Sequence, residues 1–119
     1  MTATGCGSSI EVKGTLTLDA GGNDIHWLAL RDPVDGDPCE GDMGYSDIGE
    51  GSAVVVRNGR GDKVGLGHLS EGAAKSGACV FRFTVSDVPD SGIMSVEVAH
   101  RGEVSFKPSE AKSLALTLG

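Results

Sequence analysis

Apolar and polar residues alternate along several short stretches of this chain, which is the pattern of a β-strand with one buried face. In the clearest stretch, Phe81, Phe83 and Val85 share the apolar face, and Arg82 and Thr84 lie between them. The stretches with strand character are residues 10–18, 53–57, 63–69, 79–85, 94–99, 104–106 and 114–118, and residues 25–30 are a further candidate.

Turn signals separate these stretches. Asn58-Gly59 predicts a tight hairpin, because both residues tolerate positive φ. Gly14 interrupts the apolar face of residues 10–18, which predicts a bulge or a close contact there. No segment keeps helical periodicity beyond about two turns, and only residues 109–114 could form a short helical turn. The nineteen glycines also favour tight turns over long helices.

Short strands with frequent turns predict an all-β protein. At 119 residues the chain is long enough for one ordinary domain and too short for two. We therefore predict a single-domain antiparallel β-sandwich of about seven or eight strands, immunoglobulin-like or transthyretin-like. Residues 10–119 would form the sandwich, and residues 1–9 would be an N-terminal tail.

Two segments between the predicted strands are expected to be loops, residues 31–51 and residues 70–77. The first is long for a small domain, and loops of that length are usually functional or tied down. Seven of its residues are acidic: Asp32, Asp35, Asp37, Glu40, Asp42, Asp47 and Glu50. Calcium is bound by oxygen ligands from such loops, although the spacing here is not that of an EF-hand.

The formal net charge of −7 argues against nucleic acid as a partner, because that binding needs clustered Lys and Arg. Enzymatic motifs are also missing. The segment around Ser46 shares part of the nucleophile-elbow pattern, but that pattern needs Gly two residues after the Ser, where this chain has Ile48. No Cys or His pair has zinc-ligand spacing. We therefore expect a protein that is not an enzyme, with no metal site and no cofactor.

The three cysteines bear on the cellular compartment. Cys39 lies in the acidic loop and Cys79 begins a predicted core strand, so a Cys39–Cys79 disulfide would tie that loop down. Cys6 is then left over. Ala3-Thr4-Gly5-Cys6 matches the end of a bacterial lipobox, which predicts lipidation at Cys6 and a segment remaining from a lipoprotein. The alternative is a cytosolic chain with three free thiols.

One longer pattern resembles a known kind of domain. Cys39-Glu40-Gly41-Asp42-Met43-Gly44-Tyr45-Ser46-Asp47-Ile48 is followed by Cys79-Val80-Phe81-Arg82-Phe83 and, later, by Arg101-Gly102. Together these segments resemble a small extracytoplasmic domain common in actinobacterial secreted proteins, lipoproteins and membrane-anchored proteins. The resemblance implies an exported β-sandwich with its two core cysteines bonded, and it implies no activity. Met43 stands where the pattern has Gly, and residues 24–38 are less typical of it.

These observations lead to a non-enzymatic extracytoplasmic binding module, extracellular or associated with the cell envelope. We expect the binding residues to be Asp42, Tyr45, Ser46 and Asp47, because binding sites are commonly built on loops held by a rigid scaffold. The partner would be a protein or an envelope component, and the membrane would be reached only through a lipid on Cys6. Two alternatives remain: a spacer domain without a ligand, and a calcium-dependent module that uses residues 32–50.

Overall fold

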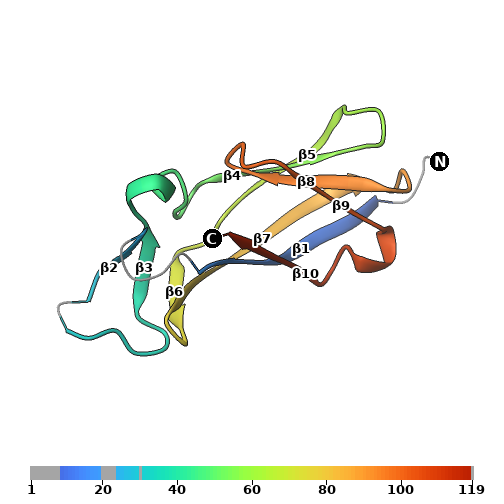
Figure 1. The fold of residues 1–119 in the computed structure, drawn as a ribbon. Coiled ribbons are helices and arrows are strands. Elements are labelled where there is room, and N and C mark those ends of the chain that lie inside the picture. Colours follow the sequence, from blue (N-terminus) through green and yellow to red (C-terminus); the bar gives the residue numbers. More distant parts are fainter. Residues whose placement is uncertain (1–8, 20–23, 30, 119) are drawn as a thin grey trace.

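The computed structural model describes residues 9–19, 24–29 and 31–118, and it folds them into two β-sheets packed face to face (Figure 1). Sheet A has six strands in the order β10-β1-β7-β6-β3-β2, and sheet B has four in the order β5-β4-β8-β9. The strands are β1 (Ser9–Leu18), β2 (Ile25–Trp27), β3 (Pro38–Gly41), β4 (Ala53–Arg57), β5 (Lys63–His68), β6 (Gly72–Lys75), β7 (Ala78–Pro89), β8 (Met94–Val98), β9 (Glu103–Phe106) and β10 (Leu114–Leu118).

The predicted all-β sandwich is confirmed, with more strands than expected. The described residues form ten strands, because β3 lies within the predicted loop 31–51 and β6 within the predicted loop 70–77. Both strands are four residues long and lack a clear apolar alternation. They form because β6 pairs with the first three residues of β7, 78–80, and β3 then pairs with β6. Tertiary pairing thus overrides weak local sequence preference.

Helical structure in the described residues is limited to short 3₁₀ turns. One of them, η3 (Pro108–Glu110), lies at the start of the segment where a helical turn was expected. None of the helices in the described part of the chain has the length and apolar character needed to span a bilayer.

The sandwich is not purely antiparallel. β1 pairs antiparallel with β7 along most of its length, but it pairs in parallel with β10, from Gly14 opposite Leu114 to Leu18 opposite Leu118. Of the two features predicted at Gly14, a bulge or a close contact, the close contact is confirmed. A Cβ atom at this position would collide with the Leu114 backbone. The bulge in β1 occurs elsewhere, between Ile10 and Val12.

The hairpin between β4 and β5 is present, but its turn differs from the predicted one. The positive φ falls on Gly61, at 86°, and neither Asn58 nor Gly59 has one. Instead, the Asn58 side-chain oxygen accepts hydrogen bonds from the N–H groups of Arg60 and Asp62, at 2.9 and 3.0 Å. Asn58 therefore organises a longer loop through its side chain.

The core lies between the sheets and is entirely apolar among the described residues. Its largest fully buried side chains come from both sheets and from one connection: Phe81, Leu16, Leu18, Ile48, Met94, Val12, Val54, Val56, Val85, Val88 and Val96, with Cys39. The alternation of the sequence predicts most of these positions. The molecule is elongated, with extents of 56 × 23 × 20 Å, and β2 and β3 lie at one end (Figure 1).

The Cys39–Cys79 disulfide is present in the structure and joins β3 to β7, with 6.0 Å between the two Cα atoms. Both cysteines are buried in the core. Gly72 at the start of β6 makes this possible, because a side chain there would clash with Cys39, Cys79 and the Phe81 ring. The disulfide therefore secures the short strands at this end of sheet A to its longest strand.

Candidate functional site

The four residues expected to bind a partner lie on the connection between the two sheets. Residues 42–52 leave β3 in sheet A and enter β4 in sheet B, beginning with the 3₁₀ turn η2 (Met43–Tyr45). The Asp42 carboxylate accepts a hydrogen bond from the Met43 N–H at 2.8 Å, and so caps this turn. The Tyr45 N–H donates to the Asp42 carbonyl, also at 2.8 Å.

Met43 adopts a left-handed backbone conformation in this turn, with φ of 52°. A side chain at such a φ costs roughly 1 kcal/mol relative to Gly. Gly would adopt this conformation without that cost, because it has no Cβ atom. The Met43 side chain is 69% exposed, and its packing offers little compensation for the strain.

Ile48 holds the connection against the core. Its side chain is fully buried, its N–H donates to the Tyr45 carbonyl, and its own carbonyl accepts from the Gly41 N–H at 2.8 Å. Gly41 has no room for a side chain, because a Cβ atom there would collide with the Tyr45 carbonyl oxygen. The connection is therefore folded tightly over the end of β3.

Arg101, in the turn between β8 and β9, clamps the same connection from sheet B. Its guanidinium donates two hydrogen bonds to the Asp47 carboxylate, one of them from Nε to Oδ2 at 3.0 Å. It also donates to the Gly44 carbonyl at 2.6 Å. The guanidinium carbon lies 4.8 Å from the centre of the Tyr45 ring, which is cation–π distance. We call Arg101, Asp47, Tyr45 and the Gly44 carbonyl the Arg101 clamp.

Electrostatics within the clamp favour both charged forms. The hydrogen bonds from Arg101 are the main cause that lowers the pKa of Asp47 below its ordinary value. The same bonds raise the pKa of Arg101. Both side chains are therefore charged throughout the physiological pH range, and they form an ion pair with each other.

The structure thus brings together two of the four expected binding residues and leaves two apart. Tyr45 is half-buried, and Tyr45 and Asp47 both contact Arg101, whereas the Asp42 side chain caps η2 and Ser46 is exposed. Sequence reasoning assigned no role to Arg101, which is 54 positions from Asp47. The only signal was its presence, with Gly102, in the pattern that the chain resembles.

Other carboxylates of the acidic segment form hydrogen bonds separately, each with its own partners. Asp37 accepts two hydrogen bonds from Arg31 and one from the Val34 N–H at 2.9 Å, and the backbone bond is the main cause that lowers its pKa. Asp35 accepts from the Ser76 N–H at 2.9 Å. Within the described ranges, no three Asp, Glu, His or Cys side chains are grouped as a metal site requires. This geometry gives the calcium alternative no support.

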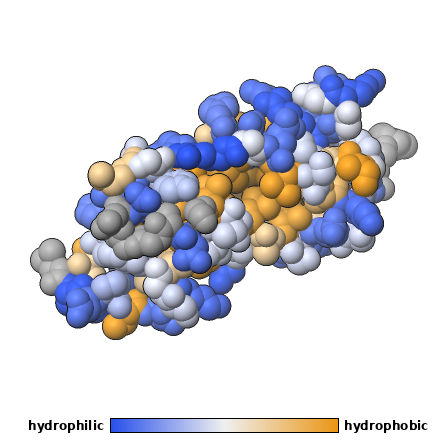
Figure 2. Space-filling model, in the orientation of Figure 1, coloured by the Kyte–Doolittle hydropathy of each residue, from blue (hydrophilic) through white to orange (hydrophobic). Residues whose placement is uncertain are grey.

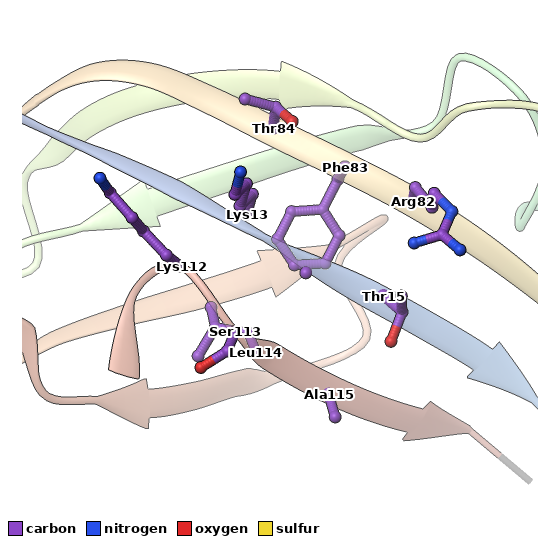
Figure 3. A pocket seen from close by; sticks show the side chains of 10 residues that line it. Lys13, Thr15, Arg82, Phe83, Thr84, Lys112, Ser113, Leu114 and Ala115 are labelled. Atoms are coloured by element: carbon purple, nitrogen blue, oxygen red, sulfur yellow. The ribbon is translucent and has the colours of Figure 1, made fainter. Parts of the chain in front are cut away.

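A second candidate site lies on the outer face of sheet A, where β1, β7 and β10 run together. An open hollow of about 460 Å³ is lined there by Lys13, Gly14, Thr15, Arg82, Phe83, Thr84, Lys112, Ser113, Leu114 and Ala115. Figure 3 shows Lys13 and Lys112 towards one end of the hollow and Arg82 towards the other. Phe83 also lines the hollow, but it belongs to the core and is only 3% exposed. We call this surface the cationic hollow.

The cationic hollow has a charge opposite to that of the whole chain. Its lining includes three basic residues and no acidic one, although the formal net charge of the protein is −7. Arg82 and Lys112 form no ion pair with another described residue, and the Lys13 ammonium lies 3.7 Å from Glu11 at the rim. The Thr15, Thr84 and Ser113 hydroxyls add neutral hydrogen-bonding groups.

The sequence alone did not indicate this hollow, because its basic residues lie far apart along the chain. Strand pairing brings them together, since Thr15 of β1 lies opposite Arg82 of β7 and Lys13 lies opposite Thr84. The alternation along both strands places Lys13 and Arg82 away from the core, and this was the available signal. Lys112 joins them through the parallel pairing of β10 with β1.

The predicted lipidation residue, Cys6, lies outside the described residues, as does most of the predicted tail 1–9. Comparison of the chain with protein-family models, with curated proteins and with solved structures finds no match.

Proposed function

We propose that this chain is a non-enzymatic, extracytoplasmic binding module that recognises an anionic component of the cell envelope through the cationic hollow. The ligand would carry phosphate or carboxylate groups, as anionic envelope polymers do. Arg binds such groups through paired N–H donors, and Lys binds them as a compact point charge. The three hydroxyls would donate to the same groups or to a sugar backbone.

The observation that carries this proposal is the segregation of charge. An acidic protein is expected to scatter its few cations among carboxylates, and four basic residues outside the hollow do form ion pairs: Arg31, Arg57, Arg60 and Arg101. The hollow gathers three cations without a carboxylate in its lining. Local positive potential of this kind attracts anions although the net charge is negative.

The oxidising compartment in the proposal rests on the disulfide. A buried Cys39–Cys79 bond is compatible with export, because cytosolic reductants keep most thiols reduced. The resemblance to actinobacterial exported domains and the lipobox match at Cys6 support the same location. A lipid on Cys6 would hold the domain close to the envelope, where its ligand is abundant.

The Arg101 clamp gives the loop residues a structural part in this proposal. Tyr45 and Asp47 contact Arg101 and hold the connection between the sheets, and the proposal places ligand binding in the cationic hollow. Asp42 and Ser46 remain exposed, but an anionic ligand would be repelled by Asp42.

The test measures affinity for two polymers, inorganic polyphosphate and poly-glutamate, with neutral dextran as the negative control. We compare the wild type with a triple variant of the hollow, Lys13→Ser, Arg82→Ser and Lys112→Ser. The matched control changes three exposed cations elsewhere, Arg60→Ser, Lys63→Ser and Lys107→Ser, so both variants have the same net charge. Binding is measured by isothermal titration calorimetry at low salt and at physiological salt.

We expect the hollow variant to lose about tenfold in affinity, since each exposed charge contact contributes about 0.5 kcal/mol. The control variant should stay within about twofold of the wild type, and added salt should weaken binding of the wild type most. The preferred polymer identifies phosphate or carboxylate as the recognised group. Equal losses in the two variants, or no binding of either polymer by the wild type, would refute the proposal.

A further inference from the structure

β10 is an edge strand of sheet A that carries none of the usual protection against pairing. It pairs with β1 on one side, and no other described strand lies on its other side. Its sequence, Leu114-Ala115-Leu116-Thr117-Leu118, has no charge and no proline. An exposed edge with these properties is a template for pairing with another strand.

The remaining edges differ from β10. β2 is only three residues long, β5 begins with Lys63, and β9 begins with Glu103. Short edges and charged side chains are the devices that proteins use to prevent strand addition. Among the described edges, β10 is therefore the one left open to a partner.

The backbone geometry shows which groups of β10 are available. The Leu118 carbonyl accepts a hydrogen bond from the Asp19 N–H at 2.9 Å, so Leu118 faces β1. In a parallel pair, alternate residues direct both backbone groups to the partner strand. Leu116 therefore also faces β1, whereas Ala115 and Thr117 direct their N–H and C=O groups away from the sheet.

An apolar seam lies beside this edge, between β10 of sheet A and β9 of sheet B. It is a hollow of about 190 Å³ whose lining is largely aliphatic: Leu16, Val96, Val98, Val104, Leu116 and Leu118, with Arg101, Gly102, Glu103 and Thr117. In the orientation of Figure 1, Figure 2 shows apolar residues exposed along the middle of this face, between more hydrophilic margins. Val104 is 48% exposed.

We propose that β10 of one copy pairs antiparallel with β10 of a second copy, about a two-fold axis at Leu116. In this register Ala115 lies opposite the Thr117 position of the other copy, so the outward groups of both residues form two hydrogen-bonded pairs. The dimer would continue sheet A through both copies. Such an isologous, closed contact is the commonest form of homodimer.

The seam and the charges at the ends of β10 both favour a second copy as the occupant. Leu114, Leu116 and Leu118 share the inner side of β10, so the same leucines of the second copy would extend over the seam beside Val104. Lys112 precedes β10 and Asp19 lies beside its end. Antiparallel pairing brings these opposite charges of the two copies towards each other.

The experiment is sedimentation equilibrium of the full chain over a range of concentrations. We expect a reversible dimer for the wild type and at least a tenfold higher dimer dissociation constant for Thr117→Pro and Thr117→Lys. Pro removes an outward N–H that β1 does not use, and Lys adds an edge charge. Ser86→Lys, at an exposed position of the central strand β7 outside the cationic hollow, is the matched control and should dimerise as the wild type does.

A cysteine variant tests the register. Leu116→Cys, in a Cys6→Ser background, should form an intermolecular disulfide on mild oxidation, because the two-fold axis places the two 116 positions opposite each other. Leu114→Cys in the same background should not, because that position lies opposite residue 118. A wild type that stays monomeric at about millimolar concentration, or edge variants that dimerise normally, would overturn the proposal. Equal cross-linking at 114 and 116 would overturn the register.

Discussion

Replacing Arg101 with Ala would remove every contact of the Arg101 clamp at once. The guanidinium bridges the Asp47 carboxylate, the Gly44 carbonyl and the Tyr45 ring, and so connects sheet B to the segment that leaves sheet A. Without it, the connection would keep the buried Ile48 side chain, its local turn hydrogen bonds and the backbone hydrogen bonds of its two ends to Asp24 and Leu69. We therefore expect Arg101→Ala to lower the free energy of unfolding.

The magnitude follows from the three contacts and their exposure. The side chains of Arg101 and Asp47 are 30% and 44% exposed, so their ion pair contributes about 0.5–1 kcal/mol. The cation–π contact contributes about 0.5–1 kcal/mol and the hydrogen bond to the carbonyl about 0.5–1 kcal/mol. Because neighbouring contacts are not additive, we expect a total loss of about 1.5–2 kcal/mol. At ~4 °C per kcal/mol, Tm would fall by about 6–8 °C.

The pH dependence of this loss identifies the carboxylate. The folded-state pKa of Asp47 is lowered below its unfolded value of about 3.9, so its stabilisation is present above that pH. It disappears as the pH falls through the folded pKa. The difference between wild type and Arg101→Ala should therefore be constant from pH 6 to 8 or so and shrink below about pH 4. The Asp37 contribution is common to both proteins and cancels.

The assay is guanidinium-induced unfolding followed by circular dichroism at several pH values. Arg60→Ala is the control, because that side chain is 85% exposed and its ion pair with Asp62 should contribute little. Asp47→Asn should lose part of the same free energy, and the double variant should lose less than the sum. If Arg101→Ala unfolds at the same denaturant concentration as Arg60→Ala, the clamp does not stabilise the connection and this reasoning is wrong.

Three further predictions concern the same end of the sandwich. Reduction of the Cys39–Cys79 bond, which closes a sequence separation of 40, should cost about 4 kcal/mol by the chain-entropy argument, and an unchanged denaturation midpoint under reductant would contradict it. Gly41→Ala should lower Tm by several degrees because its Cβ would collide with a backbone carbonyl, whereas Gly44→Ala, with open space around it, should have a much smaller effect in the same melting experiment. Met43→Gly should be neutral or stabilising by up to ~1 kcal/mol, because relief of the positive φ offsets the added freedom of the unfolded chain, and a clear loss would show that the turn does not need a left-handed residue.

The sequence predicted the strands that alternate and missed those that do not. β8 and β10 lie where apolar alternation placed them, because each strand buries one face in the core. β6 has the sequence Gly-Ala-Ala-Lys, whose small residues are equally typical of a loop. It becomes a strand because β7 offers an unpaired edge, and no local pattern records that. The parallel pairing of β1 with β10 is likewise a long-range choice.

The candidate sites likewise contain some residues that the sequence indicated and others that only the fold brings together. Tyr45 and Asp47 attracted attention because they lie in a long loop tied by a cysteine, and they do hold an organised position. Their partner Arg101 came from a distant turn, and no spacing rule connects the two segments. The cationic hollow needed the strand register before its residues could be recognised as neighbours, since Lys13 and Arg82 lie on different strands.

The most direct test of the proposed function is a ¹H–¹⁵N NMR titration of the isotopically labelled chain with inorganic polyphosphate. The account predicts that the largest amide shifts map to the cationic hollow, at residues such as Thr15, Thr84 and Ser113, and that they vanish in the Lys13, Arg82 and Lys112 triple serine variant. Shifts confined to residues 42–47, or none at saturating polymer, would contradict a binding site on the outer face of sheet A.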